Sequence, residues 1–512
     1  MAPDVPVSET PPVPAPAPST GLPDTGPPAV VADTDHSARN RLVIGLLLVS
    51  TFVVILNETI MGVALPRLMA DLSVTAVAGQ WLTTAYMLTM AVVIPVTGFL
   101  LQRLHTRPVF LTAMTLFSLG TLVCAAAPGF GTLLAGRVVQ AGGTAIMMPL
   151  LMTTVLTLVP PAGRGRVMGN ISIVISVAPA VGPTISGVIL SVLEWRWMFI
   201  LVLPIAVGSL LLGAWRMQNV TEPRPAPLDV VSVVLSALGF GGLVYGLSTL
   251  GEGGDAALPA WVPLVLGVAA LAVFVRRQTR LQRADRALLD LRTFRSRVFT
   301  MSTAVLAVSM MALFGTLIVL PIYLQTVHGL DPLGTGLLLL PGGLVMGLLA
   351  PFVGRVYDRS GPTVLLVPGS ILLSASLWYL ASTTGATPVP MVLLAHVVLS
   401  TGLALMFTPL FTAGLGALPT RLYSHGSAMV GTLQQVAGAA GTALFVTVLT
   451  LSAAGAAAAG ASAPEATEAG VRSAFLCGGI ISLLAVVGSF GVRRPAGTAA
   501  PAGTEGPGDA EG

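Results

Sequence analysis

Fourteen long apolar runs, which begin just after Arg41, constrain the fold of this chain more than any other feature. Each run holds about 17 to 25 residues, enough for a helix to cross a hydrocarbon layer of ~30 Å. Arginine, glycine or proline residues separate one run from the next. The predicted spans are 42–64, 81–101, 109–127, 133–158, 167–190, 197–215, 230–250, 259–275, 298–320, 334–353, 363–382, 391–414, 428–451 and 473–492. We therefore expect an all-α membrane protein with fourteen transmembrane helices.

The composition agrees and excludes several classes of function. Of the 512 residues 54% are hydrophobic and 9% are charged, whereas soluble domains carry about 25% charged residues. The chain has no lysine, which excludes a P-loop lysine and a Schiff-base lysine, and so an ATP-driven pump. Cys124 and Cys477 lie far apart in separate apolar runs, so a disulfide or a metal site has little support.

The positions of the arginines predict how the spans are oriented. The tails and the even-numbered connections carry 21 arginines, whereas the odd-numbered connections carry three, Arg67, Arg196 and Arg472. Because positively charged loops stay in the cytoplasm, both termini are expected there, and the protein in the cytoplasmic membrane. The same dispersal into short loops, without one basic patch, argues against nucleic acid as a partner. The expected partner is the lipid bilayer.

An internal repeat divides the spans into two sets of six. Ile94 to Gly98 at the end of the second span resembles Ala350 to Gly354 at the end of the tenth, and Pro149 in the fourth span matches Pro409 in the twelfth. Duplicated halves with a substrate path between them are common in transporters. The predicted regions are a disordered Pro-rich cytoplasmic tail (1–40), an N-terminal six-helix half (41–216), two inserted helices with a basic cytoplasmic loop (217–297), a C-terminal six-helix half (298–492) and a second disordered cytoplasmic tail (493–512).

The basic loop before the ninth span has two open interpretations. Leu281, Ala284, Leu288 and Leu291 follow one another at helical spacing, which is typical of an amphipathic helix lying on the inner leaflet. The arginines around them are also sufficient as a simple anchor on the cytoplasmic side.

Glu58 is the one acidic residue that falls well inside a predicted span. An ionisable group there costs on the order of 3 kcal/mol, which favours a function and a partner. Arg137 of the fourth span lies at the same depth, ~9 Å below the outer surface. Attraction to Arg137 favours the ionised acid and desolvation favours the protonated one, which predicts a proton switch; the alternative is a static salt bridge. Asn57 and Gln140 lie beside the two and can complete the network.

Other polar residues in the spans are candidates for lining a substrate cavity. His396 lies in the twelfth span, Gln434 and Gln435 in the thirteenth, and Tyr323 and Gln325 near the outer end of the ninth. Hydrogen bonding between helices explains such residues equally well, and packing is the more frequent role of a lone histidine.

The fifth span carries small residues around two prolines, from Ala178 to Gly187. Pro179, Gly182 and Pro183 belong to this segment, which predicts a fixed kink and a close approach of helices. Two roles remain open, a seal of one half against the other and loose packing without function.

These motifs together resemble the fourteen-helix drug:proton antiporters of the major facilitator superfamily, from about Arg41 to Arg494. The family's first-span signature, acid-x-T-I-x-x-V-A-L-P, resembles Asn57 to Pro66, with Asn57 where many members have aspartate and Glu58 one place later. Its fourth-span signature, R-x-x-Q-G-x-G, resembles Arg137 to Gly143, and its antiporter signature, G-x-x-x-G-P-x-x-G-G, resembles Ala178 to Gly187. The resemblance implies two six-helix halves and two inserted helices.

The family's loop signature G-x-x-x-D-R-x-G-R occurs twice and departs from the pattern in the first copy. The relevant residues are Gly98, Gln102, Arg103 and Arg107 in the first copy, and Gly354, Asp358, Arg359 and Gly361 in the second. In the family the first aspartate is thought to lock the outward-facing state through a helix terminus. Neutral Gln102 retains hydrogen bonding but loses the charge–dipole interaction, so we expect a weaker lock or one moved to Asp358.

The function implied is proton-coupled antiport that exports neutral or monovalent amphiphilic compounds such as drugs or antibiotics. Glu58 and Arg137 are the expected coupling residues, protons are the coupling ion, no cofactor or metal is expected, and the chain is expected to act as a monomer. The alternatives are a proton-coupled importer of a nutrient and a membrane-embedded enzyme. The enzyme has little support, because the sequence lacks H-E-x-x-H and G-x-S-x-G motifs and paired carboxylates at membrane depth.

Overall fold

A computed structural model of the protein describes residues 32–74, 76–220, 223, 228–250 and 259–493. Fourteen helices in these ranges are long and apolar enough to cross a membrane, which confirms the predicted number of spans. They are α1 (Ala32–Leu72), α2 (Ala76–Arg103), α3 (Thr106–Ala125), α4 (Phe130–Leu158), α5 (Arg164–Val192), α6 (Trp197–Arg216), α7 (Val230–Leu250), α8 (Trp261–Leu281), α9 (Arg297–Thr326), α10 (Pro332–Ser360), α11 (Thr363–Ala381), α12 (Val389–Gly416), α13 (Tyr423–Ala458) and α14 (Ala463–Ser489).

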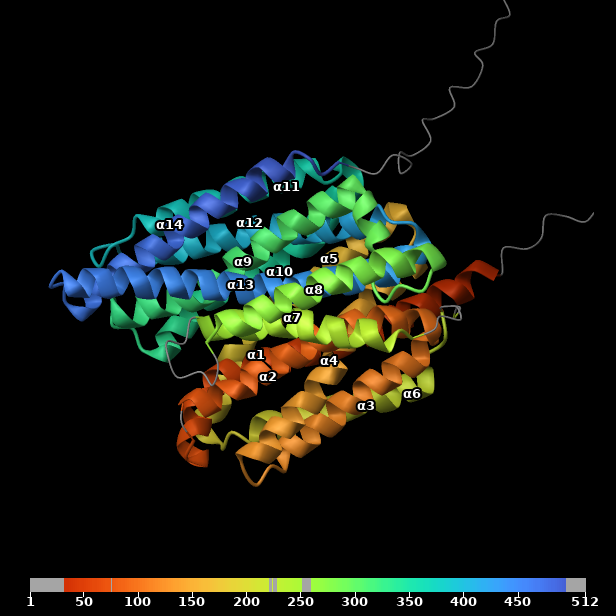
Figure 1. The fold of residues 1–512 in the computed structure, drawn as a ribbon, viewed down its shortest axis with the longest axis horizontal. Helices are drawn as coiled ribbons and strands as arrows, with labels where there is room; N and C mark the ends of the chain where they lie inside the picture. The colour runs from red at the N-terminus through yellow and green to blue at the C-terminus, as the bar shows by residue number, and fades with distance from the viewer. Residues whose placement is uncertain (1–31, 75, 221–222, 224–227, 251–258, 494–512) are drawn as a thin grey trace, which may run out of the picture.

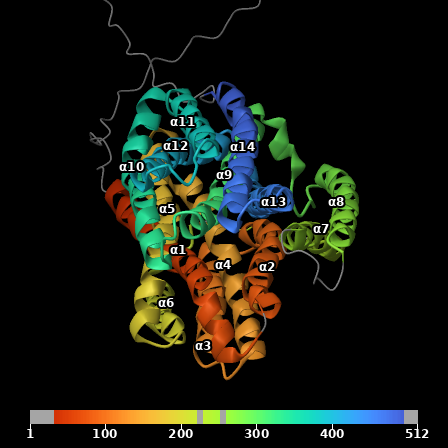
Figure 2. The same cartoon turned by 90° about the vertical axis from the view of Figure 1, so that its left-hand side faces the viewer.

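The helices lie roughly side by side along one axis and form two groups (Figure 1). Helices α1 to α6 pack mainly among themselves, and so do α9 to α14. The two groups meet where α5 packs along α10 and α2 packs along α13. Viewed along the helices, α7 and α8 lie to one side of both groups, where α7 contacts α2 and α13 (Figure 2).

Helix α1 is longer than the predicted first span. It begins at Ala32, within the segment 1–40 predicted as a disordered tail, and continues to Leu72. Residues 1–31 of that tail lie outside the described residues, as do residues 494–512 of the C-terminal one.

The connection between α8 and α9 is not the amphipathic helix that its spacing suggested, so that alternative is wrong. Helix α8 ends at Leu281, a short 3-10 turn follows, and Asp285 takes a left-handed conformation with φ 50°. Leu288 and Leu289 are 2% and 0% exposed, so they pack into the protein and not into lipid. The Gln278 side chain holds this turn by accepting from the backbone N–H of Leu288 at 2.8 Å.

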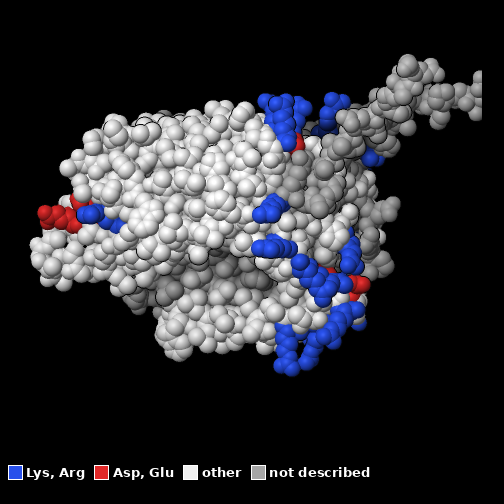
Figure 3. All heavy atoms as spheres, turned by 90° about the horizontal axis from the view of Figure 1, so that it is seen from above, with Lys and Arg blue, Asp and Glu red and all other residues white. Residues whose placement is uncertain are grey.

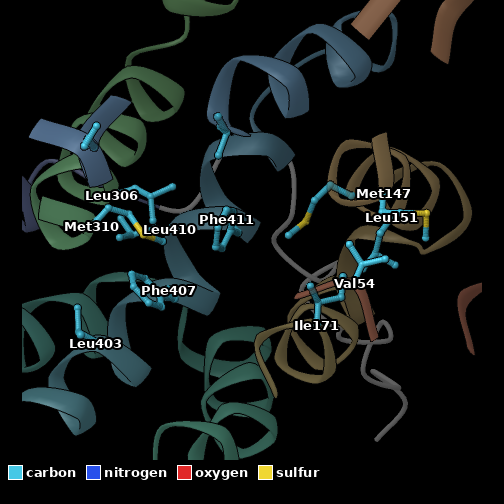
Figure 4. Packing of buried hydrophobic residues seen from close by; sticks show 14 of the residues in the cluster. Val54, Met147, Leu151, Ile171, Leu306, Met310, Leu403, Phe407, Leu410 and Phe411 are labelled. Atoms are coloured by element: carbon cyan, nitrogen blue, oxygen red, sulfur yellow. The ribbon is translucent and has the colours of Figure 1, made fainter. Parts of the chain in front are cut away.

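Arginine side chains gather at one end of the long axis (Figure 3). We call this the basic end; it carries the α2–α3, α4–α5, α8–α9 and α10–α11 connections, with Arg103, Arg164, Arg283 and Arg359 among their residues. The membrane-spanning part between the ends has an apolar core. Figure 4 shows Val54 and Met147 of the first group on one side of this core, and Met310 and Phe407 of the second group on the other.

Candidate functional site

Glu58 lies on the face of α1 that points into the protein. Val49, nine residues earlier, is 56% exposed on the outer surface, and nine residues make two and a half helical turns. Glu58 therefore points the opposite way from Val49, on the same side as the fully buried Thr51 and Val54. The Glu58 side chain remains partly exposed there, although Asn57 beside it is buried.

Arg137 lies at the level of Glu58 on α4, but its hydrogen bonds go elsewhere. Its guanidinium donates to Gln140 Oε1 at 2.7 Å and to Asn57 Oδ1 at 3.3 Å. Arg137 is 1% exposed, and its Nε has no hydrogen-bond partner. Glu58 is close enough for electrostatic attraction to Arg137, but among the described residues the two form no ion pair within 4.0 Å. The carboxyl group and the cation are thus neighbours without a salt bridge.

Three further residues complete this network, and no sequence pattern identified them. Tyr86 of α2 lies beneath the guanidinium, with 4.0 Å between Arg137 Cζ and the ring centroid. Its hydroxyl lies 2.6 Å from Thr144 Oγ1 on α4. Gln140 Nε2 donates to Thr121 Oγ1 of α3 at 2.8 Å. Tyrosine and threonine are common in apolar spans, so nothing in their spacing distinguished them.

The α5 segment from Ala178 to Gly187 lies directly against the helix that carries Glu58. Thr59 Oγ1 is 3.4 Å from the Ala178 carbonyl oxygen, and a Cβ atom on Gly182 would overlap the Thr59 side chain. Glycine at this position therefore allows α1 and α5 to approach closely. Pro179 and Gly187 are partly buried on the same helix, whereas the side chain of Pro183 lies outside the described residues.

Asp358, the aspartate of the second loop signature, joins the two groups of helices at the basic end. Its carboxylate oxygens accept from the backbone N–H groups of Gly165 at 2.8 Å and Arg166 at 2.9 Å. Gly165 and Arg166 lie in the first turn of α5, so a negative charge on α10 caps the positive end of a helix in the other group. Helices α5 and α10 can approach this closely because they cross at Gly165 and Gly354, where no side chain separates the two backbones.

Gln102, the corresponding residue of the first copy, makes the symmetry-related contact without a charge. Its Nε2 donates to Ser424 Oγ at 3.0 Å and lies against Nε2 of His425, at the start of α13. Gly98 lets α2 approach the same turn, because a Cβ there would press on Ala428 and on the Ser424 carbonyl. Each group of helices thus contacts the first turn of a helix in the other group, one through a carboxylate and one through an amide.

The remaining loop-signature residues hold the basic end within each group. Arg107 donates to the Ala214 carbonyl of α6 at 2.5 Å, and Arg103 lies over the Phe99 ring. Gly361 ends α10 with φ 78°, a conformation that favours glycine. Arg359, in the last turn of α10, is exposed.

Two hydroxyl pairs continue the contact between the groups toward the middle of the membrane. Thr153 of α4 bonds Ser427 of α13 at 2.7 Å, and Ser172 of α5 bonds Thr408 of α12 at 2.6 Å. Among the described side chains, the hydrogen bonds that join the two groups begin at the basic end. They extend no farther than mid-membrane, where Gln435 Nε2 contacts Met90 Sδ. The described hydrogen bonds between the two groups are therefore concentrated toward the basic end.

The other predicted cavity residues lie in three different places. His396 is buried within the second group, with Nε2 3.2 Å from the Leu339 carbonyl oxygen of α10. Tyr323 is buried at the end opposite the basic one, where its hydroxyl donates to the Thr384 carbonyl at 2.7 Å, and Gln325 is exposed nearby. Gln434 lines a small apolar pocket between the two groups. Gln435 differs from them, because its side chain contacts Met90, one helical turn from Tyr86 of the Arg137 network.

An ion pair between Asp229, just before α7, and Arg277, in the last turns of α8, ties the inserted helices together. Asp229 accepts from Arg277 Nε at 2.6 Å, and this bond with Arg277 lowers the pKa of Asp229 from 3.8 to about 2. Asp285 in the next connection has its pKa lowered by Arg292. Within the described ranges, no group of three or more His, Cys, Asp or Glu side chains is placed to hold a metal ion.

Comparisons with known proteins agree with this architecture. Residues 47–442 match the model of the Major Facilitator Superfamily. The lincomycin resistance protein LmrB of Bacillus subtilis is 38% identical over 88% of this chain and 95% of its own length. The multidrug resistance protein B homolog of Mycobacterium tuberculosis H37Rv is 30% identical over 85% of this chain and 81% of its own.

Solved structures share the fold at low identity. The human organic anion transporter MFSD10 gives a TM-score of 0.61 with 15% identity, covering 86% of this chain and 99% of its own. The proton:xylose symporter XylE gives 0.60 with 13% identity, covering 88% and 95%. The chain therefore belongs to the major facilitator superfamily, as a multi-pass membrane transporter and not an enzyme, among the fourteen-span members related to lincomycin and multidrug resistance proteins.

Proposed function

We propose that this protein is a proton-coupled antiporter that exports neutral or monovalent amphiphilic compounds across the cytoplasmic membrane. The observation that carries the proposal is Glu58, a carboxyl group on the inward face of α1 that lies beside Arg137 without an ion pair. An acid placed in this way can exchange a proton during transport, whereas a static salt bridge would hold it ionised.

The distribution of contacts supports an assignment of sides and of conformational state. The arginine-rich end is taken as cytoplasmic, with both termini there. Because the hydrogen bonds between the two groups lie toward that end, the protein faces outward in this state. Glu58 then takes a proton from outside as substrate leaves, and substrate arriving from the cytoplasm favours release of the proton inward.

The energy available limits the kind of substrate. One proton, crossing ~100 mV and ~1 pH unit, supplies about 3.7 kcal/mol, which supports roughly a 500-fold gradient of a neutral compound. For a monovalent cation the exchanged charges cancel, leaving the pH difference and about a tenfold gradient. Neutral and monovalent compounds are therefore the proposed substrates, and the monomer the proposed transporting unit.

The names of the relatives agree with export of such compounds, whereas the fold by itself does not set the direction. LmrB is a lincomycin resistance protein, and the mycobacterial relative is a homolog of a multidrug resistance protein. XylE, with the same fold, is a proton:xylose symporter. The α5 segment from Ala178 to Gly187, packed on Thr59 next to Glu58, supports antiport over import.

Transport in proteoliposomes tests the proposal. The probes are lincomycin and ethidium, a monovalent aromatic cation, each followed under an imposed proton gradient in the parent, in Glu58→Gln and in Glu194→Gln. Glu194, in the exposed connection before α6, is the matched control for loss of a carboxylate. We expect uphill transport in the parent and in Glu194→Gln, and its loss in Glu58→Gln while the probe still binds. Uphill transport by Glu58→Gln at the parental rate would place the proton site elsewhere.

A further inference from the structure

The aromatic ring of Tyr86 lies beneath Arg137, and the role inferred for it rests on the proposed function of Glu58. Tyr86 is 1% exposed on α2, and its ring centroid lies 4.0 Å from Arg137 Cζ. A cation against the face of an aromatic ring gains ~0.5–1 kcal/mol at exposed sites and about 2 or more when water is excluded. At this buried position, the ring is a substantial partner for the guanidinium charge.

The Tyr86 ring is fixed by the same helix that carries Arg137. Thr144 Oγ1 donates its hydrogen to the Gln140 carbonyl at 3.1 Å. Since a hydroxyl has one hydrogen, the contact of 2.6 Å between Thr144 and Tyr86 has the tyrosine hydroxyl as donor. Thr144 lies two helical turns after Arg137. The Tyr86 hydroxyl is therefore held by Thr144, while the face of the Tyr86 ring lies against the Arg137 guanidinium.

The remaining partners of the Arg137 charge are neutral. Gln140 and Asn57 contribute amide oxygens, and Nε of Arg137 has no partner. A guanidinium ordinarily prefers a carboxylate, and Glu58 is the residue next to Asn57. The arrangement therefore needs a contact that compensates for the missing carboxylate, and the Tyr86 ring is the group in that position.

We propose that Tyr86 is a positioning residue that holds the Arg137 guanidinium away from the Glu58 carboxylate, so that the carboxylate can take up a proton. Without the ring, the cation moves toward the carboxylate and stabilises its ionised form. The proton would then bind only at lower pH. Tyr86 acts in this way through Arg137 and not by its own ionisation.

The helices packed around Glu58 bring few other charged or titratable groups to this level. They are Arg137 from α4, Tyr86 from α2 and, behind these, Cys124 of α3. Helices α5 and α6 carry Arg164, Arg166 and Arg216 as their titratable residues, all at the basic end. A change in the pH dependence of Glu58 after substitution of Tyr86 is thus attributable to Arg137 or to water entering the site.

Infrared difference spectroscopy of the purified protein measures this directly and without substrate. The band of the protonated carboxyl group that is missing in Glu58→Gln is followed as a function of pH. In Tyr86→Leu the midpoint should fall by about one pH unit relative to the parent, whereas Tyr86→Phe, which keeps the ring, should stay close to it. Tyr86→Met, which has a flexible side chain without a ring, repeats the test if the leucine variant does not fold.

Two results would overturn the inference. One is an unchanged midpoint in folded Tyr86→Leu or Tyr86→Met. The other is a midpoint that falls equally when Tyr86→Leu is added to Arg137→Gln and compared with Arg137→Gln alone. The fall would then arise from water entering the site and not from the guanidinium. A parent that shows this titration but no uphill transport would contradict the proposed function and leave the role of Tyr86 supported.

Discussion

The charged cap that Asp358 places on α5 predicts a measurable bias toward the state closed at the basic end. In Asp358→Asn the cap loses its charge and one of the two acceptors that bind Gly165 N–H and Arg166 N–H. Hydrogen bonds to charged groups contribute about 1.5–3 kcal/mol, and a charge at a helix N-terminus ~0.3–1 kcal/mol. Because Asp358 is partly exposed, we take about 2 kcal/mol in all, or roughly a 30-fold shift toward the open basic end.

The matched substitution is Gln102→Ala, which removes the neutral contacts with Ser424 and His425 in the symmetry-related position. Neutral hydrogen bonds contribute about 0.5–1.5 kcal/mol each, and because Gln102 is partly exposed we take about 1 kcal/mol in all, or a shift of only about fivefold. Double electron–electron resonance between spin labels at Leu104 and Ser360, both exposed at the basic end, measures the two populations once Cys477 is replaced. Equal shifts in the two variants, or none in Asp358→Asn, would refute the reasoning from charge.

Three further predictions concern the packing and the ties between helices. Gly182→Val should cost about 1–3 kcal/mol and reduce transport, because the new side chain meets Thr59; Gly208→Ala, where a Cβ meets no atom within 4 Å, should keep the parental melting temperature. Asp229→Asn should lower the free energy of unfolding by about 1 kcal/mol at neutral pH, since the pKa of Asp229 is lowered to about 2. This difference between the parent and Asp229→Asn should vanish as the pH falls from 4 to 2, which denaturation in detergent at several pH values measures. A difference that persists at pH 2 would show that the Asp229–Arg277 pair is not responsible. Thr153→Val should open the basic end about fivefold, whereas an unchanged population in the same spin-label experiment would show that its bond with Ser427 is not needed for closure.

The spans could be predicted from the sequence because lipid imposes a simple requirement on length and polarity. Hydropathy says less about where a helix leaves the membrane, and α1 begins at Ala32, ahead of the predicted start. The α8–α9 connection shows a second limit. Its apolar residues have helical spacing, but Asp285 takes a left-handed conformation that ends the helix, and Leu288 turns into the protein.

The sequence predicted how deep in the membrane the site residues lie, but not which way their side chains point around the helix axis. Counting residues from the span ends placed Glu58 and Arg137 at one level, since each residue advances a helix by 1.5 Å. Neighbouring residues differ by 100° around the axis, and in the structure it is Asn57 that bonds Arg137. The contribution of Tyr86 depends on how α2 packs against α4, which no local pattern reveals.

The coupling of proton and substrate movement through Glu58 is the central claim, and its most direct test is proton flux driven by substrate alone. Proteoliposomes loaded with lincomycin and a pH-sensitive dye are diluted into medium without lincomycin, with the membrane potential clamped at zero. Lincomycin leaving the parent should drive protons inward, and this acidification should be absent in Glu58→Gln and intact in Glu194→Gln. Protons leaving together with lincomycin, or equal acidification in Glu58→Gln, would contradict antiport through Glu58.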